Sequence, residues 1–367
     1  MTMLKFSMRL IVAMVFVQLG LHSVLRAEPT AVTLPAADQA WQNLQHDYQT
    51  PPAPLKQLPN RMYTQQEIRD YYAKVASRAG EVADEAKAFY TQYPNNPNTA
   101  KAQDIYFDML QAAVALSNTA KIDELEAATA ERLKDPKLDD DGRFQLSLRV
   151  LRSVVSGRQY EGDDAMRGEL EKRARQLAHD YPNHPDGYNY LLNLARAADP
   201  KKCATLAREV LAGSHDAKTR AESQFLINRS LAVGKPLQLT LALSDGKKMD
   251  LQQQQGKVVI LLFWDSASQY SPKALWAVNE LYKTYHAKGV EVLGLNFDSD
   301  RSAEAATLKD VGVKWPQYMD IPAGRMVENR FGADTLPMCW MVDKKGVLRE
   351  LHAERDPEGI LKKLLME

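Results

Sequence analysis

The hydrophobic and polar positions divide the chain into two parts with different periodicity. Between residues 64 and 233, apolar side chains recur every three or four positions in long segments rich in Ala, Leu, Glu, Lys and Arg, which predicts amphipathic helices. From residue 234 onward, short apolar runs alternate with helical segments, which predicts a sheet covered by helices. We therefore expect an α+β chain with an all-α domain at residues 61–233 and an α/β domain at residues 234–367.

Two helix starts in the first domain have specific signals. The segment "TQQE", from Thr64 to Glu67, has the spacing of a capping box, in which each side chain accepts a main-chain N–H of the other residue. Asp199 followed by Pro200 places an acceptor at the cap and a proline in the first turn. Both positions are expected to begin a helix.

A short motif occurs twice in the helical domain. "AKAFYTQYPNNPNTA" around Tyr93 and "ARQLAHDYPNHPDGY" around Tyr181 each place a YPN(N/H)P turn after an amphipathic helix. The prolines prevent the helix from continuing, so the next helix is expected to return antiparallel. Helical hairpins of the tetratricopeptide style and an irregular helical bundle both remain open.

The sequence pattern of the second domain predicts a mixed sheet. A short strand, a turn at Asp245–Gly246 and a second short strand come first. We then expect strands at residues 258–264, 290–297, 338–342 and 347–351, with helices at residues 271–287, 303–311 and 357–365.

The N-terminus has the order of a secretory signal peptide. Lys5 and Arg9 precede the apolar run 10–19, and no acid occurs before Glu28. The run is about half of the ~20 residues that a spanning helix needs, so we expect cleavage after Ala27 and a periplasmic or secreted protein with no membrane span. An uncleaved anchor facing the periplasm is the alternative. Residues 28–60 form a Pro- and Ala-rich lead-in with at most one short helix, at residues 37–49.

Charge and cysteine content narrow the functional classes. The chain has 47 basic and 47 acidic residues without blocks of one sign, which argues against a nucleic-acid partner. Cys203 and Cys339 are the only cysteines; they form either one disulfide or two buried thiols.

Four segments of the C-terminal domain are specific when they are taken together: "GKPLQLTLALSDGKKMDL", "GKVVILLFW", "KGVEVLGLNFDSD" and "TLPMCWMVDKKGVL". In these segments the domain resembles the thioredoxin-fold domain of TlpA/ResA-type proteins and the AhpC/TSA redoxin family. This resemblance implies that "FWDSASQYSP" is the active-site turn, where the family presents Cys-x-x-Cys at a helix N-terminus that stabilises a thiolate.

This chain has serine at both of those cysteine positions, Ser268 and Ser271. A serine alkoxide is far less accessible at neutral pH and forms no analogue of a disulfide, so dithiol chemistry is excluded there. Leu262 replaces the buried polar residue that the family usually has before Phe-Trp. Ser271 followed by Pro272 instead favours a capped helix start, with the serine hydroxyl accepting a main-chain N–H.

Two other chemistries find little support in the sequence. A hydrolytic serine beside Asp265 would need a base in reach, and no histidine adjoins this turn. His179 and His184 flank a turn without the spacing of a metal site. We expect neither a metal nor a cofactor.

The resemblance also implies a binding groove. Pro337 matches the family proline opposite the active turn, so the Leu336–Pro337 bond is expected to be cis and the neighbouring backbone to pair with an extended polypeptide. Cys339 follows on the same strand as either a buried thiol or a lone reactive one. The residues assigned to the groove are Trp264, Asp265, Ser268, Gln269, Tyr270, Ser271, Leu336 and Pro337.

We expect binding rather than catalysis. The hypothesis is an exported, redox-inactive thioredoxin-like protein that acts as an adaptor for a polypeptide or protein partner. The alternative is a thiol-disulfide oxidoreductase or peroxidase-type protein that uses Cys339, alone or with Cys203. A third interpretation makes the domain a stabilising cap on the helices.

Overall fold

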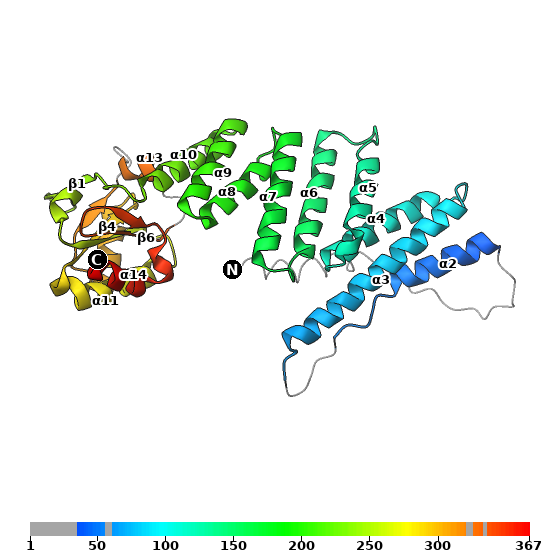
Figure 1. Ribbon diagram of the computed structural model, residues 1–367, viewed down its shortest axis with the longest axis horizontal. Coiled ribbons are helices and arrows are strands. Elements are labelled where there is room, and N and C mark those ends of the chain that lie inside the picture. Colours follow the sequence, from blue (N-terminus) through cyan, green and yellow to red (C-terminus); the bar gives the residue numbers. More distant parts are fainter. Residues whose placement is uncertain (1–34, 56–60, 321–325, 333–335) are drawn as a thin grey trace. The chain divides into compact units, whose positions relative to one another are not determined.

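The computed structural model describes residues 35–55, 61–320, 326–332 and 336–367. The expected signal peptide and cleavage position lie outside these residues. The chain divides into two compact units, at residues 1–184 and 185–367. The expected α+β organisation, with a helical region followed by a mixed-sheet domain, is confirmed (Figure 1).

Among its described residues, the first unit has helices and no strand. Its helices are α2 (Ala36–Gln49), α3 (Gln65–Gln92), α4 (Thr99–Ala115), η1 (Thr119–Lys121), α5 (Ile122–Arg132), α6 (Asp140–Gly157) and α7 (Asp163–Asp180). The capping box at Thr64 and Glu67 is present, with both of its hydrogen bonds. Helix α2 is the expected lead-in helix, and its Leu44 is buried in the same core as Phe89.

Both YPN(N/H)P segments form the same turn. Tyr93 donates its N–H to the Phe89 carbonyl at 2.9 Å, and Tyr181 donates to the Leu177 carbonyl at 3.0 Å. The backbone angles of the two tyrosines agree closely, at φ −123° and ψ 59° against φ −130° and ψ 65°. The sequence likeness is therefore matched by local geometry.

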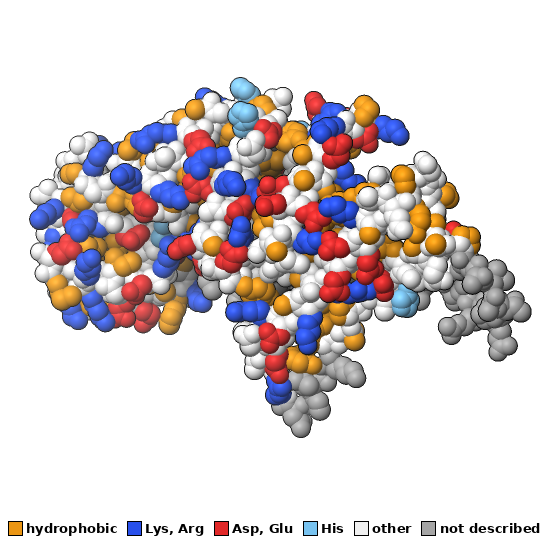
Figure 2. Space-filling model, turned by 45° about the vertical axis from the view of Figure 1, so that its right-hand side comes forward, with side chains coloured by type: hydrophobic (Ala, Val, Ile, Leu, Met, Phe, Trp, Pro, Cys, Tyr) orange, Lys and Arg blue, Asp and Glu red, His pale blue; other side chains and the backbone are white. Residues whose placement is uncertain are grey.

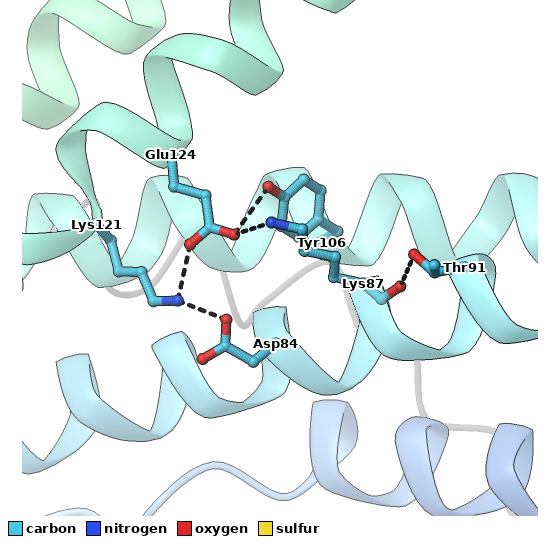
Figure 3. A network of polar contacts seen from close by, with 6 residues as sticks. All are labelled: Asp84, Lys87, Thr91, Tyr106, Lys121 and Glu124. Carbon is cyan, nitrogen blue, oxygen red and sulfur yellow. Dashed lines mark hydrogen bonds and ion pairs between the residues drawn. The ribbon is translucent and has the colours of Figure 1, made fainter.

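A polar network joins α3, α4, η1 and α5 (Figure 3). Glu124 on α5 accepts hydrogen bonds from Lys121, Lys87 and Tyr106, the last at 3.1 Å. Burial disfavours its carboxylate, but the bonds from Lys121 and Lys87 outweigh that cost and lower the pKa of Glu124 to about 2.

The second unit combines three helices with the sheet domain. Its elements are α8 (Asp186–Ala197), α9 (Pro200–Gly213), α10 (Ala217–Ala232), β1 (Thr240–Ala242), β2 (Lys248–Asp250), η2 (Leu251–Gln254), β3 (Val258–Trp264), α11 (Ser271–Tyr285), η3 (His286–Lys288), β4 (Val290–Asn296), α12 (Arg301–Val311), β5 (Gln317–Met319), α13 (Met326–Phe331), β6 (Met338–Val342), β7 (Leu348–Glu350), η4 (Ala353–Arg355) and α14 (Pro357–Met366). Asp199 caps α9 as expected, accepting the N–H groups of Lys201 and Lys202.

The five-stranded sheet has the order β5-β4-β3-β6-β7. Strand β3 pairs parallel with β4 and antiparallel with β6, so it occupies the centre of a mixed sheet. One face packs on the β1–β2 hairpin and α13, and the other packs on α11 and α14 (Figure 1). Strand β5 and helix α13 were not anticipated from the sequence.

Helix α10 is bound directly to the sheet domain. Arg229 donates its Nε–H to the Phe331 carbonyl, and Asn228 donates to the Arg330 carbonyl at 2.9 Å. Gly332 follows with φ +72°, and a Cβ there would lie 2.6 Å from Phe225. Helices α8–α10 therefore group with the sheet domain, although the periodicity changes only near residue 234.

Basic and acidic side chains are interspersed over the face shown in Figure 2, as the zero net charge suggests. None of the described helices combines the length and the apolar composition needed to cross a bilayer.

Candidate functional site

The candidate site lies at the carboxyl end of the central strand. All seven residues of β3 are buried, because aliphatic and aromatic side chains on a central strand face packed layers on both sides of the sheet. The chain leaves the sheet after Trp264, turns through residues 265–270 and enters α11 at Ser271. This strand, turn and helix are where the resemblance places a dithiol motif.

Ser268 connects the turn to the loop before β6. The Asp265 carboxylate accepts the Ser268 N–H at 2.7 Å, which closes the turn. The Ser268 hydroxyl donates to the Leu336 carbonyl at 3.1 Å and accepts the Tyr270 N–H at 3.4 Å. The first motif serine therefore holds the turn against the loop that carries Pro337.

Ser271 does not cap the helix, so that part of the sequence analysis is wrong. Tyr270 occupies the cap position without a side-chain cap hydrogen bond, while Ser271 is already the first helical residue. The Ser271 side chain is fully buried, and its hydroxyl has no hydrogen-bond partner among the residues described. A cap residue needs non-helical backbone angles to turn its oxygen back onto a free N–H, and a residue within the helix lacks them.

A second set of contacts anchors the turn from β4. Ser266 donates both its N–H and its hydroxyl to one oxygen of the buried Asp298, at 2.9 and 2.8 Å. Asn296 donates to the other oxygen at 2.8 Å. These residues were not predicted from the sequence, although "NFDSD" directly after a strand is a recognisable polar signal.

No described contact activates either motif serine as a nucleophile. Asp265 accepts a main-chain N–H rather than a serine hydroxyl. The two histidines that follow the turn in the chain are engaged elsewhere: His286 Nδ1 lies 3.0 Å from the Val290 carbonyl, and His352 Nδ1 lies 3.3 Å from Glu354. Acyl transfer needs a base within hydrogen-bond reach of the hydroxyl, and the described residues provide none.

The structure divides the expected groove residues into buried and accessible ones. Trp264 is fully buried and donates its indole N–H to Gln317 Oε1 at 3.1 Å, so its assignment to a groove is wrong. Ser271 is also buried and cannot line a surface. The residues that remain accessible are Asp265, Ser268, Gln269, Tyr270, Leu336 and Pro337.

Large aromatic side chains are exposed in the turn and in the helix that follows it. Tyr270 is 64% exposed, and the Leu336–Pro337 bond beside Ser268 is cis. Trp276, on the solvent side of α11, is 60% exposed and was missed. The sequence contains its signal, because the buried stripe of α11 runs through Leu275 and Val278 and leaves position 276 outside it.

Neither cysteine has the environment of a reactive thiolate. Cys339 is 2% exposed, and burial, together with the nearby Glu354 carboxylate, raises the pKa of its thiol well above the usual range. Burial also raises the pKa of Cys203 on α9. Both thiols are free, so the two cysteines form no disulfide. A buried, protonated thiol is a poor nucleophile.

The expected absence of a metal site can be examined only for the described residues. Within them, no group of three or more His, Cys, Asp or Glu side chains is arranged to hold a metal ion. His184 stacks on Phe144 with ring centroids 3.9 Å apart, and His179 contacts Asp180.

Residues 233–351 match the model of the AhpC/TSA family. The thiol-disulfide oxidoreductase ResA of Bacillus thuringiensis (strain Al Hakam) is 33% identical over 124 residues, which cover 33% of this chain and 70% of that protein. ResA of Bacillus subtilis (strain 168) is 26% identical over 103 residues, covering 28% of this chain and 56% of that protein.

Solved structures match the same region. A thiol-disulfide oxidoreductase from Bacteroides fragilis is 25% identical, with a TM-score of 0.31, and the match covers 35% of this chain and 98% of that one. The thioredoxin domain of a thiol-disulfide oxidoreductase from Bacteroides vulgatus is 18% identical, with a TM-score of 0.31, covering 35% and 94%.

Proposed function

Because this chain belongs to the thioredoxin-like AhpC/TSA family that includes ResA, yet has serine at both motif positions, we propose that it is a redox-inactive member that binds polypeptides. The binding surface consists of the turn at residues 265–270 and the Leu336–Pro337 loop. The proposal places the protein in the exported compartment, on the basis of the N-terminal sequence.

The observation that carries this proposal is the hydrogen bond from the Ser268 hydroxyl to the Leu336 carbonyl. It holds the turn and the proline loop together without a thiol. The bond keeps the accessible turn beside the proline loop, which supports a single surface formed by both segments.

Exposed side chains in the turn and in the helix that follows it suit a protein partner. Tyr270 and Trp276 are large, mostly exposed aromatic residues within one short stretch of chain, and Gln269 adds a flexible amide. Tyrosine and tryptophan are the residues most enriched where truncation costs the most binding energy, because each contributes a large apolar area with few rotatable bonds. An extended polypeptide would place side chains against them.

The test measures binding of a reduced and carboxymethylated, hence unfolded, polypeptide to the full chain by fluorescence anisotropy. Tyr270→Ala and Trp276→Ala should each weaken binding about tenfold or more. Met62→Ala is the matched control, because Met62 is an exposed apolar residue in the helical unit, and its affinity should equal that of the wild type. Equal affinities in all four proteins, or no binding by the wild type, would reject the proposal.

A further inference from the structure

The helical unit contains a cavity of about 430 Å³. Helix α3 forms one wall, the segment that follows α4 forms the second, and the end of α6 with the residues after it forms the third. The volume falls within the range of small-molecule sites, roughly 300–1,000 Å³. The lining lies entirely before residue 185, so the cavity shares no residue with the polypeptide surface proposed above.

One wall of the cavity is apolar and lies where two helices approach closely. A Cβ at Gly157 on α6 would collide with the carbonyl oxygen of Val114 on α4, so this contact requires glycine. The apolar lining consists of small and aliphatic side chains beside this contact: Ala73, Ala76 and Leu116. Such a wall suits the C–H face of a small ring.

Ser117 lines the cavity in a backbone conformation that favours glycine. Its φ is +82°, at the residue after the end of α4. Its own N–H donates to the Val114 carbonyl at 3.0 Å, and the next N–H donates to the Ala113 carbonyl at 2.9 Å, which is the pattern of a Schellman motif. The Ser117 hydroxyl accepts a long hydrogen bond from Gln159, at 3.5 Å. The side chain is therefore unfavourable for the backbone but supplies a polar group to the cavity.

Three further polar side chains line the cavity with unused hydrogen-bonding capacity. Asn118, Thr119 and Tyr160 are each partly exposed, and none of their side chains forms a hydrogen bond within the described part of the chain. Carboxamide and hydroxyl groups both donate and accept hydrogen bonds. Groups of this kind match the hydroxyl groups of a ligand, which also do both.

Arg69 gives the cavity a cation that forms no ion pair with any described acid. Its guanidinium carbon lies 4.9 Å from the ring centroid of Tyr160, and this contact holds it beside the cavity. Residues three and four positions away on a helix are the nearest neighbours of a side chain. On α3 these residues are uncharged: Gln65, Gln66, Tyr72 and Ala73.

The acids near Arg69 do not cancel its charge. Glu161 lines the cavity and stays ionised, but the Arg158 guanidinium donates to both of its oxygens at 2.9 Å and offsets its charge. Asp70 lies outside the lining, about 100° around the helix from Arg69, and accepts a hydrogen bond from Gln66 at 2.7 Å. One uncompensated cation suits a monoanion, whereas a dianion would bring a second charge toward Glu161 without a second cation.

We propose that this cavity binds a monocarboxylate that carries hydroxyl groups on a ring, the chemical class of the uronic acids. The Arg69 guanidinium donates two parallel hydrogen bonds to the carboxylate. The neutral polar side chains of the lining exchange hydrogen bonds with the hydroxyl groups, and the ring C–H groups contact the apolar wall beside Gly157. An apolar carboxylate would leave the neutral polar groups unpaired, and an uncharged sugar would leave Arg69 without a counter-charge.

The probes are D-glucuronate and D-galacturonate, which differ in the orientation of one hydroxyl group. D-Glucose is the reference without a carboxylate, and cyclohexanecarboxylate is the reference without hydroxyl groups. Isothermal titration calorimetry of the full chain should give a dissociation constant of about 1 mM or lower for at least one uronate, and values at least about tenfold higher for both references. No binding of either uronate at about 10 mM, or equal binding by a reference, would overturn the proposal.

Variants test whether the cavity is the binding site. Arg69→Gln should weaken uronate binding about tenfold or more, because it removes the charge. Tyr160→Phe should weaken it about threefold, because it removes the hydroxyl and keeps the ring that supports Arg69. The matched controls are Arg149→Gln on α6 and Tyr71→Phe on α3, which lie outside the lining and should bind like the wild type. If the lining variants behave like these controls, the cavity is not the binding site.

Ser117→Gly separates binding from folding. Glycine relieves the left-handed φ, so the midpoint of thermal unfolding should be unchanged or higher than in the wild type. The variant also removes a hydroxyl from the lining, so uronate binding should weaken about threefold. Unchanged affinity in this variant would contradict the role assigned to Ser117.

Discussion

Strand β3 and the turn that follows it are adjacent in sequence but carry different properties of the domain. The strand is buried along its whole length between two neighbouring strands and two packed layers. None of the six turn residues is buried, and the turn is held by polar contacts from Asp265, Ser268 and Asp298. The strand supplies the buried apolar contacts of the fold, and the turn contains the positions where the family has its reactive cysteines.

This difference explains how the domain keeps its fold without the dithiol. Replacing sulfur by oxygen at position 268 leaves a group that still makes a hydrogen bond, here to the Leu336 carbonyl. At position 271 the replacement leaves a buried hydroxyl without a described partner, which is a modest cost for a domain of this size. Neither change disturbs the apolar contacts of β3.

The largest expected effect is in the strand. Leu261→Ala removes a fully buried side chain from the centre of the sheet and should lower the free energy of unfolding by about 2–5 kcal/mol, measured by urea denaturation of the second unit's tryptophan signal. Gln269→Ala, at an exposed turn position, should change it by less than about 0.5 kcal/mol. Similar losses in both variants would remove the distinction between strand and turn.

The next effect concerns the contact between the turn and the proline loop. Ser268→Ala removes the donor to the Leu336 carbonyl and the acceptor for the Tyr270 N–H, so it should destabilise the domain by about 1–2 kcal/mol. Urea denaturation, as for Leu261→Ala, measures this change in the free energy of unfolding. A lower free energy of unfolding with unchanged polypeptide affinity would show that the hydrogen bond between Ser268 and Leu336 serves stability alone.

Replacing Glu124 in the helical unit should change the free energy of unfolding by an amount that depends on pH. Glu124→Gln should cost about 1 kcal/mol at pH 7, since solvent partly screens its pairs with Lys121 and Lys87. The pKa of Glu124 is lowered from its usual 4.5 to about 2, so its stabilisation is present above pH 4.5 and is lost as the pH falls toward 2. Denaturation of the two proteins across that interval should converge at the acidic end, whereas a constant difference would contradict the assigned pKa.

The smallest effect has the opposite sign. Ser271→Ala removes a buried hydroxyl that has no described partner, so it should leave stability unchanged or raise it by up to about 1 kcal/mol. Calorimetry of this variant beside Ser268→Ala separates the two motif serines. A loss as large as that of Ser268→Ala would show that the Ser271 hydroxyl is in fact satisfied.

The sequence predicted the elements that its own periodicity specifies. Strands β3 and β6 coincide with the predicted ranges 258–264 and 338–342, because continuous apolar runs on a central sheet leave little freedom in their bounds. Strand β5 has only the residues Gln317–Met319, and it exists through its pairing with β4, which no local pattern encodes.

The site was predicted less completely, for a related physical reason. The motif positions and the proline loop follow from sequence spacing, but whether Trp264 faces a groove or the core depends on packing from α11 and on Gln317. The orientation of the Ser271 hydroxyl likewise depends on where the helix begins. A cavity between α8–α10 and β6–β7 depends on the docking of these elements, a tertiary arrangement that periodicity does not describe.

The central claim is that the fold persists here without an electron-transferring group. Its most direct test is thiol-dependent reduction of insulin by the full chain, compared with a variant in which Cys203→Ser and Cys339→Ser are combined. The account predicts that the wild type shows no turnover above this cysteine-free variant. Turnover by the wild type that disappears in the variant would contradict it.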